Sequence, residues 1–386
     1  MIKGIPFSLG IEEEYQIVDP ITLDLVSSAQ QILDQSIISF PEANLKPEFM
    51  ECQIESNSNI CKDVKEVRQE IIRLRKTVSQ LADINNCKIV AASTHPFASW
   101  QEQKIWDNER YRVILEQLRG VIAQFLIFGF HVHIGFGDDR ELLIDVMNQI
   151  RYFLPHILAL STSSPFWCGN DMGLKSYRSV IFEALPRTGI PDAFNSYEEY
   201  WEYVEMLGKV GSIRDPNTGK ADPTKIWWDI RPNPKFNTLE IRIADIPTRL
   251  DEAVSIAALI QALAAKLALL RKQNMSWRRY RQFYYMENKW RAMRFGIDGN
   301  LIDFGNACET PMRSLVFEIL DFVDDVVDDL NSREELNILH TIVKEGTSAD
   351  RQLAVYHKSI EQGASTQVAL KNVVERLVSE TMEGVL

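Results

Sequence analysis

The segment FSLGIEEEYQIV, residues 7–18, is the best guide to the architecture of this chain. Apolar and polar residues alternate along it, which predicts a β-strand with one aliphatic face. The opposite face carries Glu12 and Glu14, whereas Glu13 points to the aliphatic side. Two carboxylates on one face repel each other unless positive charge lies between them. The segment therefore predicts a sheet and, on one face of that sheet, a candidate site.

Three other segments share this pattern, in which an aliphatic face lies opposite a face that holds Glu, His or Arg. They are residues 49–56 with Glu51, Gln53 and Glu55, residues 128–136 with His131 and His133, and residues 238–244 with Glu240 and Arg242. Strands of a buried parallel sheet are usually apolar on both faces, so the alternation favours antiparallel pairing. We therefore expect an α+β fold in which helices pack on one face of an antiparallel sheet.

Helical patterns lie between and after these strands. The first begins at Asp63, which has Glu66 three residues later, the spacing of a capping box. Further helices are expected at residues 142–160, at residues 251–271 and over most of the chain beyond Thr310. No linker or repeat divides the sequence, which favours a single catalytic domain over residues 1–386 with a mostly helical C-terminal portion from about residue 306.

Composition narrows the class of protein. A formal net charge of -12 over 386 residues disfavours a nucleic-acid partner, because the phosphate backbone is also negative. The apolar stretch at residues 253–270 contains Gln261 and Lys266, so we expect a buried helix and no membrane partner. Five cysteines without a CxxC pair, and an N-terminus without a secretory signal, predict a cytoplasmic location. Small molecules are the expected partners, and the oligomeric state, including a homodimer, is left open.

The carboxylates point to a metal site. Glu12, Glu14, Glu55 and Glu240 on one sheet face would repel one another strongly without bound cations. An excess of oxygen ligands over imidazole selects Mg²⁺, or Mn²⁺, rather than Zn²⁺. His131 could complete such a site. Each carboxylate taken alone could also be an ordinary solvated strand residue.

His131 and His133 also permit a different interpretation. Two histidines on one strand face begin the zinc site of many metal-dependent hydrolases. They could equally be hydrogen-bonded histidines of the core or of a cleft. A zinc hydrolase would leave Glu12, Glu14 and Glu240 without a role, so we rank it below the magnesium site.

Phosphate binding would depend on arginines. Residues 169–176, GNDMGLKS, lack the spacing of a P-loop and are expected to form a loop. Phosphates would then be held by metal ions and by Arg178, Arg231 and Arg242. Arg242 could contact a transferring phosphoryl group while Glu240 holds the metal. It could instead only offset the charge of Glu240.

Eight motifs, in order, resemble the type 2 glutamate-cysteine ligases, which are carboxylate-amine ligases of the glutamine synthetase-like superfamily. They are LGIEEEYQIV (9–18), KPEFMECQIES (46–56), THPF (94–97), DNERY (107–111), GFHVHIGF (129–136), SSPFWCGNDMGLKSYRS (163–179), WWDIRPNPKFNTLEIRIAD (227–245) and GTSADRQLAVY (346–356). The resemblance implies a glutamine synthetase-like catalytic fold, in which a curved antiparallel sheet binds ATP and metal on its concave face. ATP would be a co-substrate and Mg²⁺ the cofactor.

The resemblance also implies roles for individual residues. The metal ligands would be Glu12, Glu14, Glu48, Glu55, His131 and Glu240, although which of Glu48, Glu51 and His133 contact the metal is left open. Arg242 and Arg231 would be catalytic, and ATP or substrate would contact Arg178, Arg110, Thr94 and Glu51. Glu48 lies an odd number of residues before Glu55, so we expect a bulge near Pro47 to bring it onto the same face.

The implied reaction joins glutamate to cysteine at the expense of ATP, through a γ-glutamyl phosphate. No motif reads out the cysteine side chain, so another amine acceptor is the alternative. One departure from the family is Asn237, in a turn where the family usually has Gly. Asn tolerates a positive φ better than most residues, so we expect the turn to persist.

Overall fold

The main sheet is antiparallel at its strand pairs. The structure, a computed structural model, describes residues 4–215 and 218–385, without the side chain of Arg110. Within this part the sheet has seven strands, β1 (Leu9–Val18), β2 (Leu45–Pro47), β3 (Gln53–Asn57), β4 (Lys88–Val90), β5 (Phe130–Gly135), β8 (Ile230–Asn233) and β9 (Thr238–Ile241). Their order is β2-β3-β1-β5-β9-β8, and β4 also pairs with β1.

Strand register sets the predicted site residues side by side. Glu14 lies opposite Glu55 on β3, and Glu12 lies opposite His131 on β5. On the next strand pair, His133 lies opposite Glu240. Directly opposed residues are the closest neighbours across a sheet, so the face predicted to be acidic becomes one continuous surface.

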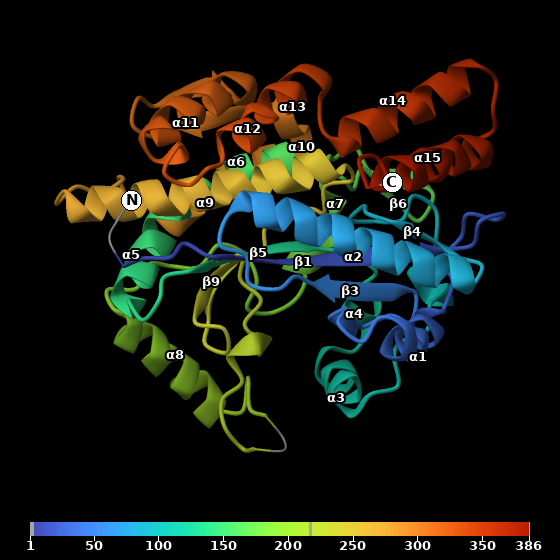
Figure 1. The fold of residues 1–386 in the computed structure, drawn as a ribbon, viewed down its shortest axis with the longest axis horizontal. Helices are drawn as coiled ribbons and strands as arrows, with labels where there is room; N and C mark the ends of the chain where they lie inside the picture. Colours follow the sequence, from blue (N-terminus) through green and yellow to red (C-terminus); the bar gives the residue numbers. More distant parts are fainter. Residues whose placement is uncertain (1–3, 216–217, 386) are drawn as a thin grey trace.

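Helices lie on both sides of the sheet, and the larger number cover its apolar face. They are α1 (Ala29–Ser39), α2 (Val64–Ile84), α3 (Glu109–Leu118), α4 (Gly120–Ala123), α5 (Arg140–Ile150), α6 (Leu154–Ser161), α7 (Tyr177–Glu183), α8 (Tyr197–Lys209), α9 (Leu250–Lys272), α10 (Gln282–Phe295), α11 (Met312–Val327), α12 (Arg333–Asn337), α13 (Leu339–Glu345), α14 (Ser348–Glu361) and α15 (Thr366–Thr381). In Figure 1, α2 and α9 cross above the sheet, α11 to α13 form a further layer beyond α9, and α3 and α8 lie on the opposite side. Helix α15 packs against β4, and α14 packs on α15. This arrangement confirms the α+β class.

The long apolar helix α9 is part of the core. By length and composition it could span a membrane, but 83% of its most apolar window is buried inside the protein. Helices α2, α5 and α11 pack against it. The amide nitrogen of its Gln261 donates a hydrogen bond to the carbonyl oxygen of Phe7, at 2.8 Å, so this polar interruption is tied into the core. The expectation of a buried helix is confirmed.

Two local predictions, a helix cap and a turn, are confirmed. Asp63 caps α2 by accepting a hydrogen bond from the amide of Glu66. Asn237 adopts a φ of +54° in the turn between β8 and β9, as expected for an asparagine in place of glycine. Residues 169–176 include the short strand β7 (Asn170–Asp171), which pairs with β6 (Phe166–Trp167), and then lead into α7 without forming a P-loop.

Two predicted elements are wrong in detail. The helix expected at residues 142–160 is two helices, α5 and α6, because Pro155 lacks an amide hydrogen and fits only the first turn of a new helix. The strand expected from residue 49 begins only at Gln53, because the chain turns there to bring β2 against β3. Glu51 lies in this turn and does not continue the acidic face.

Candidate active site

A cavity of about 330 Å³ lies over the polar face of the sheet. Its charged lining comes from six strands or their ends and from α7, and consists of Glu12, Glu14, Lys46, Glu48, Glu55, His131, Arg178, Arg231, Lys235, Glu240 and Arg242. Its apolar lining includes Phe49, Tyr111, Ile114, Ile122, Phe125, Ile127, Phe182, Leu185, Trp227 and Phe236. The cavity therefore combines an acidic floor, a few arginines and an apolar wall.

Three carboxylates converge at one end of the floor. One oxygen each of Glu14, Glu48 and Glu55 lies within 4.8 Å of the other two. Burial raises the pKa of all three, and for Glu48 the charges of Glu14 and Glu55 raise it further. Lys46 forms an ion pair with Glu55 at 3.3 Å, but the side chain of Lys46 is partly exposed to solvent. A cation bound among the three oxygens would remove this mutual repulsion.

Glu48 reaches this cluster without the expected bulge. It follows β2, whereas Glu55 lies on β3, and the turn of residues 48–52 separates them. The odd spacing conflicts with strand alternation only if both residues lie on one strand. Because Glu48 follows β2 and Glu55 lies on β3, both side chains can lie over the same face of the sheet.

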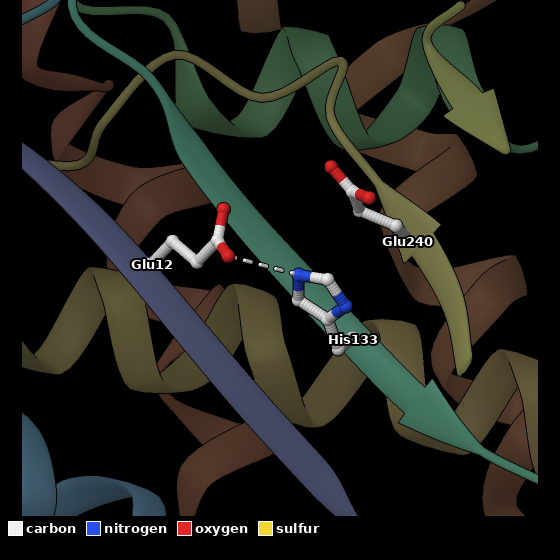
Figure 2. Close-up of side chains that lie close together, drawn as sticks. All are labelled: Glu12, His133 and Glu240. Atoms are coloured by element: carbon white, nitrogen blue, oxygen red, sulfur yellow. Dashed lines mark ion pairs between the residues drawn. The ribbon is translucent and has the colours of Figure 1, made fainter. Parts of the chain in front are cut away.

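A second cluster contains Glu12, His133 and Glu240, whose ligand atoms also lie within 4.8 Å of one another. Figure 2 shows the imidazole of His133 between the two carboxylates. His133 Nε2 lies 3.4 Å from Glu12 Oε1, and this buried nitrogen has no hydrogen-bond partner within the described residues. The other ring nitrogen, Nδ1, lies 2.9 Å from the hydroxyl of Thr238, which orients the ring. Although burial opposes protonation, Glu12 and Glu240 raise the pKa of His133, so this position attracts positive charge.

His131, the histidine predicted as a ligand, lies on the other side of Glu12. Its Nδ1 is 3.0 Å from Glu12 Oε2 and 3.4 Å from Arg242 Nη1. Burial and the neighbouring Arg242 lower the pKa of His131 to about 4. The structure thus groups His133, rather than His131, with Glu240, while both histidines contact Glu12.

Glu240 is surrounded by donors. Arg231 donates to both of its oxygens, at 3.0 and 3.1 Å, Asn233 donates at 2.9 Å, and Arg242 donates to Oε1. Burial opposes its ionisation, but the two arginines outweigh burial and hold the pKa of Glu240 well below its usual range. Arg231 also donates to the carbonyl oxygens of Thr224 and Ile226, at 2.8 and 2.5 Å. Arg231 is thereby fixed within the protein, where it orients Glu240.

Arg178 and Arg242 line the cavity, and each has an unpaired donor. The Nε of each is buried without a hydrogen-bond partner within the described residues. Both guanidinium groups lie over the ring of Phe182, at 5.4 and 5.9 Å from its centroid. Planar groups with free N–H donors suit phosphate or carboxylate oxygens. These two arginines are the cationic groups best placed to contact an anionic ligand.

Asp245 holds the segment that carries Arg178. It accepts hydrogen bonds from the amide of Ser163 and the hydroxyls of Ser164 and Ser176, at 2.9, 2.7 and 2.9 Å. Arg178 Nη1 lies 3.9 Å from the same carboxylate. This network explains the serines of the segment 163–179, since they fix the start of α7 against the end of β9.

The structure does not bring every predicted residue to the cavity. Thr94 is buried and donates to the carbonyl oxygen of Phe166 at 2.7 Å, away from the lining residues. Glu51 lies in the turn before β3 and is also not among them. The side chain of Arg110 lies outside the described residues.

Two residues missing from the predicted set shape the floor. The amide of Gly129 donates to Glu14 Oε2 at 2.7 Å, and Gln53 donates to the same oxygen at 3.2 Å. A Cβ on Gly129 would lie 2.8 Å from His131 Nε2 and 3.0 Å from Arg178 Nη2. Gln53 could have been inferred from its place on the acidic strand face, and Gly129 begins the GFHVHIGF segment.

The donor set fits a hard divalent cation better than zinc. Each cluster within the described residues has at least two carboxylates, and one has no imidazole at all. Zinc sites usually rely on nitrogen or sulfur ligands, whereas Mg²⁺ and Mn²⁺ prefer oxygen. The orphaned Nε2 of His133 is the one nitrogen ligand that these clusters offer.

Comparison with known proteins identifies the family. The family model described as glutamate-cysteine ligase family 2 (GCS2) matches residues 8–376. A curated protein of Herpetosiphon aurantiacus, named "Putative glutamate--cysteine ligase 2", is 49% identical over 380 residues, which cover 98% of this chain and 94% of that protein.

Two solved structures share the fold at low sequence identity. A glutamate–cysteine ligase of Francisella tularensis in complex with AMP has a TM-score of 0.67 at 12% identity, over 98% of this chain and 89% of that one. A bifunctional glutathione synthetase of Pasteurella multocida has a TM-score of 0.63 at 15% identity, over 97% and 53%. With a family model that spans nearly the whole sequence, the chain belongs to glutamate-cysteine ligase family 2, a family of ATP-dependent carboxylate-amine ligases.

Proposed function

We propose that this ligase joins the γ-carboxylate of glutamate to the amine of cysteine, with ATP as the energy source and Mg²⁺ as the cofactor. One observation carries the proposal: the carboxylates of both clusters and two arginines with unpaired donors line the same cavity. That combination suits a reaction between two anions, a carboxylate and a polyphosphate, which repel each other without cations. Mn²⁺ could replace Mg²⁺ at the same ligands.

The metal ligands follow from the clusters. Glu14, Glu48 and Glu55 would hold one ion, and Glu12, His133 and Glu240 would hold another. When bound, Mg²⁺ supplies charge neutralisation for the phosphate groups and the reacting carboxylate. Glu12 contacts both histidines, so it also fixes the rings that face the second position.

The reaction would have two steps. An oxygen of the glutamate γ-carboxylate attacks the terminal phosphorus of ATP, ADP leaves, and a γ-glutamyl phosphate forms. The amine of the acceptor then attacks the acyl carbon, the phosphate leaves, and one proton is released. Neither step needs a nucleophilic side chain, which agrees with Cys52, Cys61 and Cys87 being buried outside the cavity lining.

The three arginines would have different roles in the reaction. Arg242 contacts Glu240 of the second cluster and also His131, so it can stabilise charge on the phosphoryl group during transfer. Arg178, beside it over Phe182, would contact the nucleotide or the acyl phosphate. Arg231 would act indirectly, because its donors hold Glu240 and two backbone carbonyls.

Another amine acceptor is the second candidate, and the cavity wall favours testing it. Phe49, Phe125 and Phe182 lie along one side with Ile114, Ile122 and Ile127. A cysteine thiol is small, and these six side chains offer no polar group that would distinguish it from an apolar side chain. An amine with a larger apolar group would bury more surface there.

A phosphate-release assay tests the proposal. ATP, Mg²⁺ and glutamate should release phosphate rapidly only when an amine is also present, and the amide product should appear in equal amount. A panel of amines, from cysteine to apolar amino acids, ranks the acceptors by kcat/KM. Hydrolysis of an amide without ATP would support the zinc interpretation, and ATP binding without product would indicate a nucleotide-binding protein.

Two further expectations accompany the proposal. A single domain over residues 1–386 is supported by Thr381, near the C-terminus, whose hydroxyl accepts from the amide of Ala91 at 2.9 Å and whose carbonyl accepts from Arg75 at 3.1 Å. A cytoplasmic location is supported by the free cysteines, three of which are buried.

A further inference from the structure

One face of α10 exposes an unusual amount of aromatic surface. Six large aromatic side chains are exposed among the described residues, and four of them lie on this helix. They are Phe283, Tyr284, Trp290 and Phe295, with 62, 44, 49 and 45% of their surface accessible. Scattered exposed apolar residues are ordinary, but several on one helix face mark a site of contact with another molecule.

The exposed residues form a stripe. Phe283, Glu287, Trp290 and Arg294 are spaced by four, three and four residues, which puts them on one side of an α-helix. The buried residues of the helix, Tyr285, Asn288, Lys289, Ala292 and Met293, occupy the other side. The helix therefore has a complete inner face, and no element of the described residues covers its outer face.

The order of charges on the stripe is self-complementary. Glu287 lies about one turn before Trp290, and Arg294 lies one turn after it. If a second copy packs antiparallel with the two Trp290 rings near the two-fold axis, each Glu287 meets the Arg294 of the other copy. An interface between two identical surfaces must be self-complementary: residue i of one copy contacts residue j of the other, and residue j of the first contacts residue i of the second. Arg294 has no ion pair within the described residues, so its charge is available for such a contact.

We propose that the outer face of α10 is the interface between two copies of this chain. Trp290 is the central anchor, Phe283 and Phe295 extend the apolar contact on either side, and two Glu287–Arg294 pairs set the antiparallel register. Buried tryptophans near the centre of an interface dominate its affinity, and charge pairs at the rim fix orientation.

The inner face of α10 dictates how the interface must be tested. Lys289 donates to Asp229 at 2.7 Å and contacts Glu183 at 2.7 Å. Asp229 precedes β8, and Glu183 ends α7, the helix that carries Arg178. Ligase activity is therefore an ambiguous readout for changes in α10, whereas oligomeric state is direct and does not depend on the proposed chemistry.

Sedimentation velocity of the full chain provides the first test. We expect a dimer at micromolar concentration, and Trp290→Ala should raise the dimer dissociation constant by about 100-fold or more. Phe317→Ala is the matched control, because Phe317 is an aromatic residue of α11 with a similar exposure of 44%, and it should leave the dimer intact. A monomeric unmodified chain, or a dimer that Trp290→Ala leaves unchanged, would overturn the proposal.

Charge exchange provides the second test and does not depend on Trp290. Glu287→Arg places like charges opposite each other at both pairs, and so does Arg294→Glu, so each variant alone should dissociate. Mixing the two variants restores both pairs and should give a heterodimer, as should the double variant with itself. Glu287 also pairs with Arg291 on its own helix, at 3.2 Å, but an exposed pair of this kind contributes little to stability. Single variants that remain dimeric, or a mixture that remains monomeric, would contradict the antiparallel arrangement.

Discussion

The two faces of β1 place adjacent glutamates in opposite environments. Glu13 points to the core, where the guanidinium of Arg75 pairs with it at 2.6 Å and the hydroxyl of Tyr15 donates to it at 2.5 Å. Both members of this ion pair are sealed from solvent, with side chains 2 and 0% exposed. Glu12 and Glu14, on the other face, line a cavity shared with Glu48 and Glu55.

The difference lies in the balance of charge. The buried carboxylate of Glu13 and the buried guanidinium of Arg75 together carry no net charge. Arg75 also donates to the carbonyl oxygens of Thr248, Pro247 and Thr381. On the cavity face, Glu14, Glu48 and Glu55 converge. The partly exposed Lys46 pairs with Glu55, and Arg178 and Arg242 act on Glu14 without outweighing the burial that raises its pKa. A matched pair is structural, whereas an excess of carboxylates indicates that the missing positive charge arrives with a ligand.

The largest effect should follow from Glu14→Gln. The amide oxygen can still accept from Gly129 and Gln53, so we expect the free energy of unfolding to stay the same or to rise as repulsion disappears. Loss of one charged ligand should lower ligase turnover by on the order of 10³-fold. Steady-state phosphate release and urea unfolding measure the two quantities. An active Glu14→Gln enzyme at ordinary Mg²⁺ would remove Glu14 from the metal site.

The next largest loss of activity should come from replacement of Arg242. If it stabilises charge that develops during transfer, Arg242→Ala lowers kcat by on the order of 10²-fold, roughly 3 kcal/mol, with a much smaller change in KM for ATP. Arg242→Lys should remain badly impaired, because an ammonium cannot replace a planar guanidinium that contacts two oxygens. Were kcat retained and only KM raised, Arg242 would bind ATP at rest, and Arg178 would be the better candidate for the transition state.

Glu13→Gln should show the reverse pattern. It leaves the buried Arg75 without its carboxylate, so we expect a loss of about 3 kcal/mol in the free energy of unfolding. Turnover per folded molecule should be close to that of the unmodified enzyme, because Glu13 does not line the cavity. Urea unfolding together with activity below the transition gives both values. Equal loss of turnover in Glu13→Gln and Glu14→Gln would mean that the two faces are not functionally distinct.

The smallest effect concerns two glycines on the cavity face. A Cβ on Gly129 would press on His131 and Arg178, whereas one on Gly10 would meet His133 Cβ at an ordinary 3.5 Å. We expect Gly129→Ala to lower kcat about tenfold, near 1.4 kcal/mol, and Gly10→Ala to change it little. A comparison of kcat values at saturating ATP decides between them. If the two variants behave alike, space at Gly129 is not what positions the cavity side chains.

Alternation in the sequence predicted the acidic face and the inward direction of Glu13, because strand periodicity is a local property. The cap at Asp63 and the positive φ of Asn237 were equally local and equally predictable. The apolar periodicity of residues 142–160 did not reveal the break at Pro155. A proline in the first turn of a new helix interrupts such a pattern no more than a proline inside one long helix.

Contacts between distant segments could not be predicted. Arg75 is 62 residues from Glu13 along the chain, and nothing in the spacing of either residue indicates the pair. The grouping of His133 with Glu240, and of Glu48 with Glu14, depends on strand register and on where β2 ends. A sequence pattern shows which face a side chain occupies, but register determines which side chains meet.

Metal binding itself, measured without turnover, tests the cavity face most directly. Mn²⁺ titration followed by electron paramagnetic resonance should show tight binding to the unmodified chain, and Glu48→Gln should weaken binding at its cluster by about tenfold or more. Glu13→Gln, measured where it is folded, should bind Mn²⁺ as the unmodified chain does. Equal Mn²⁺ affinity in the unmodified chain and in Glu48→Gln would contradict the assignment of the excess carboxylates to a metal site.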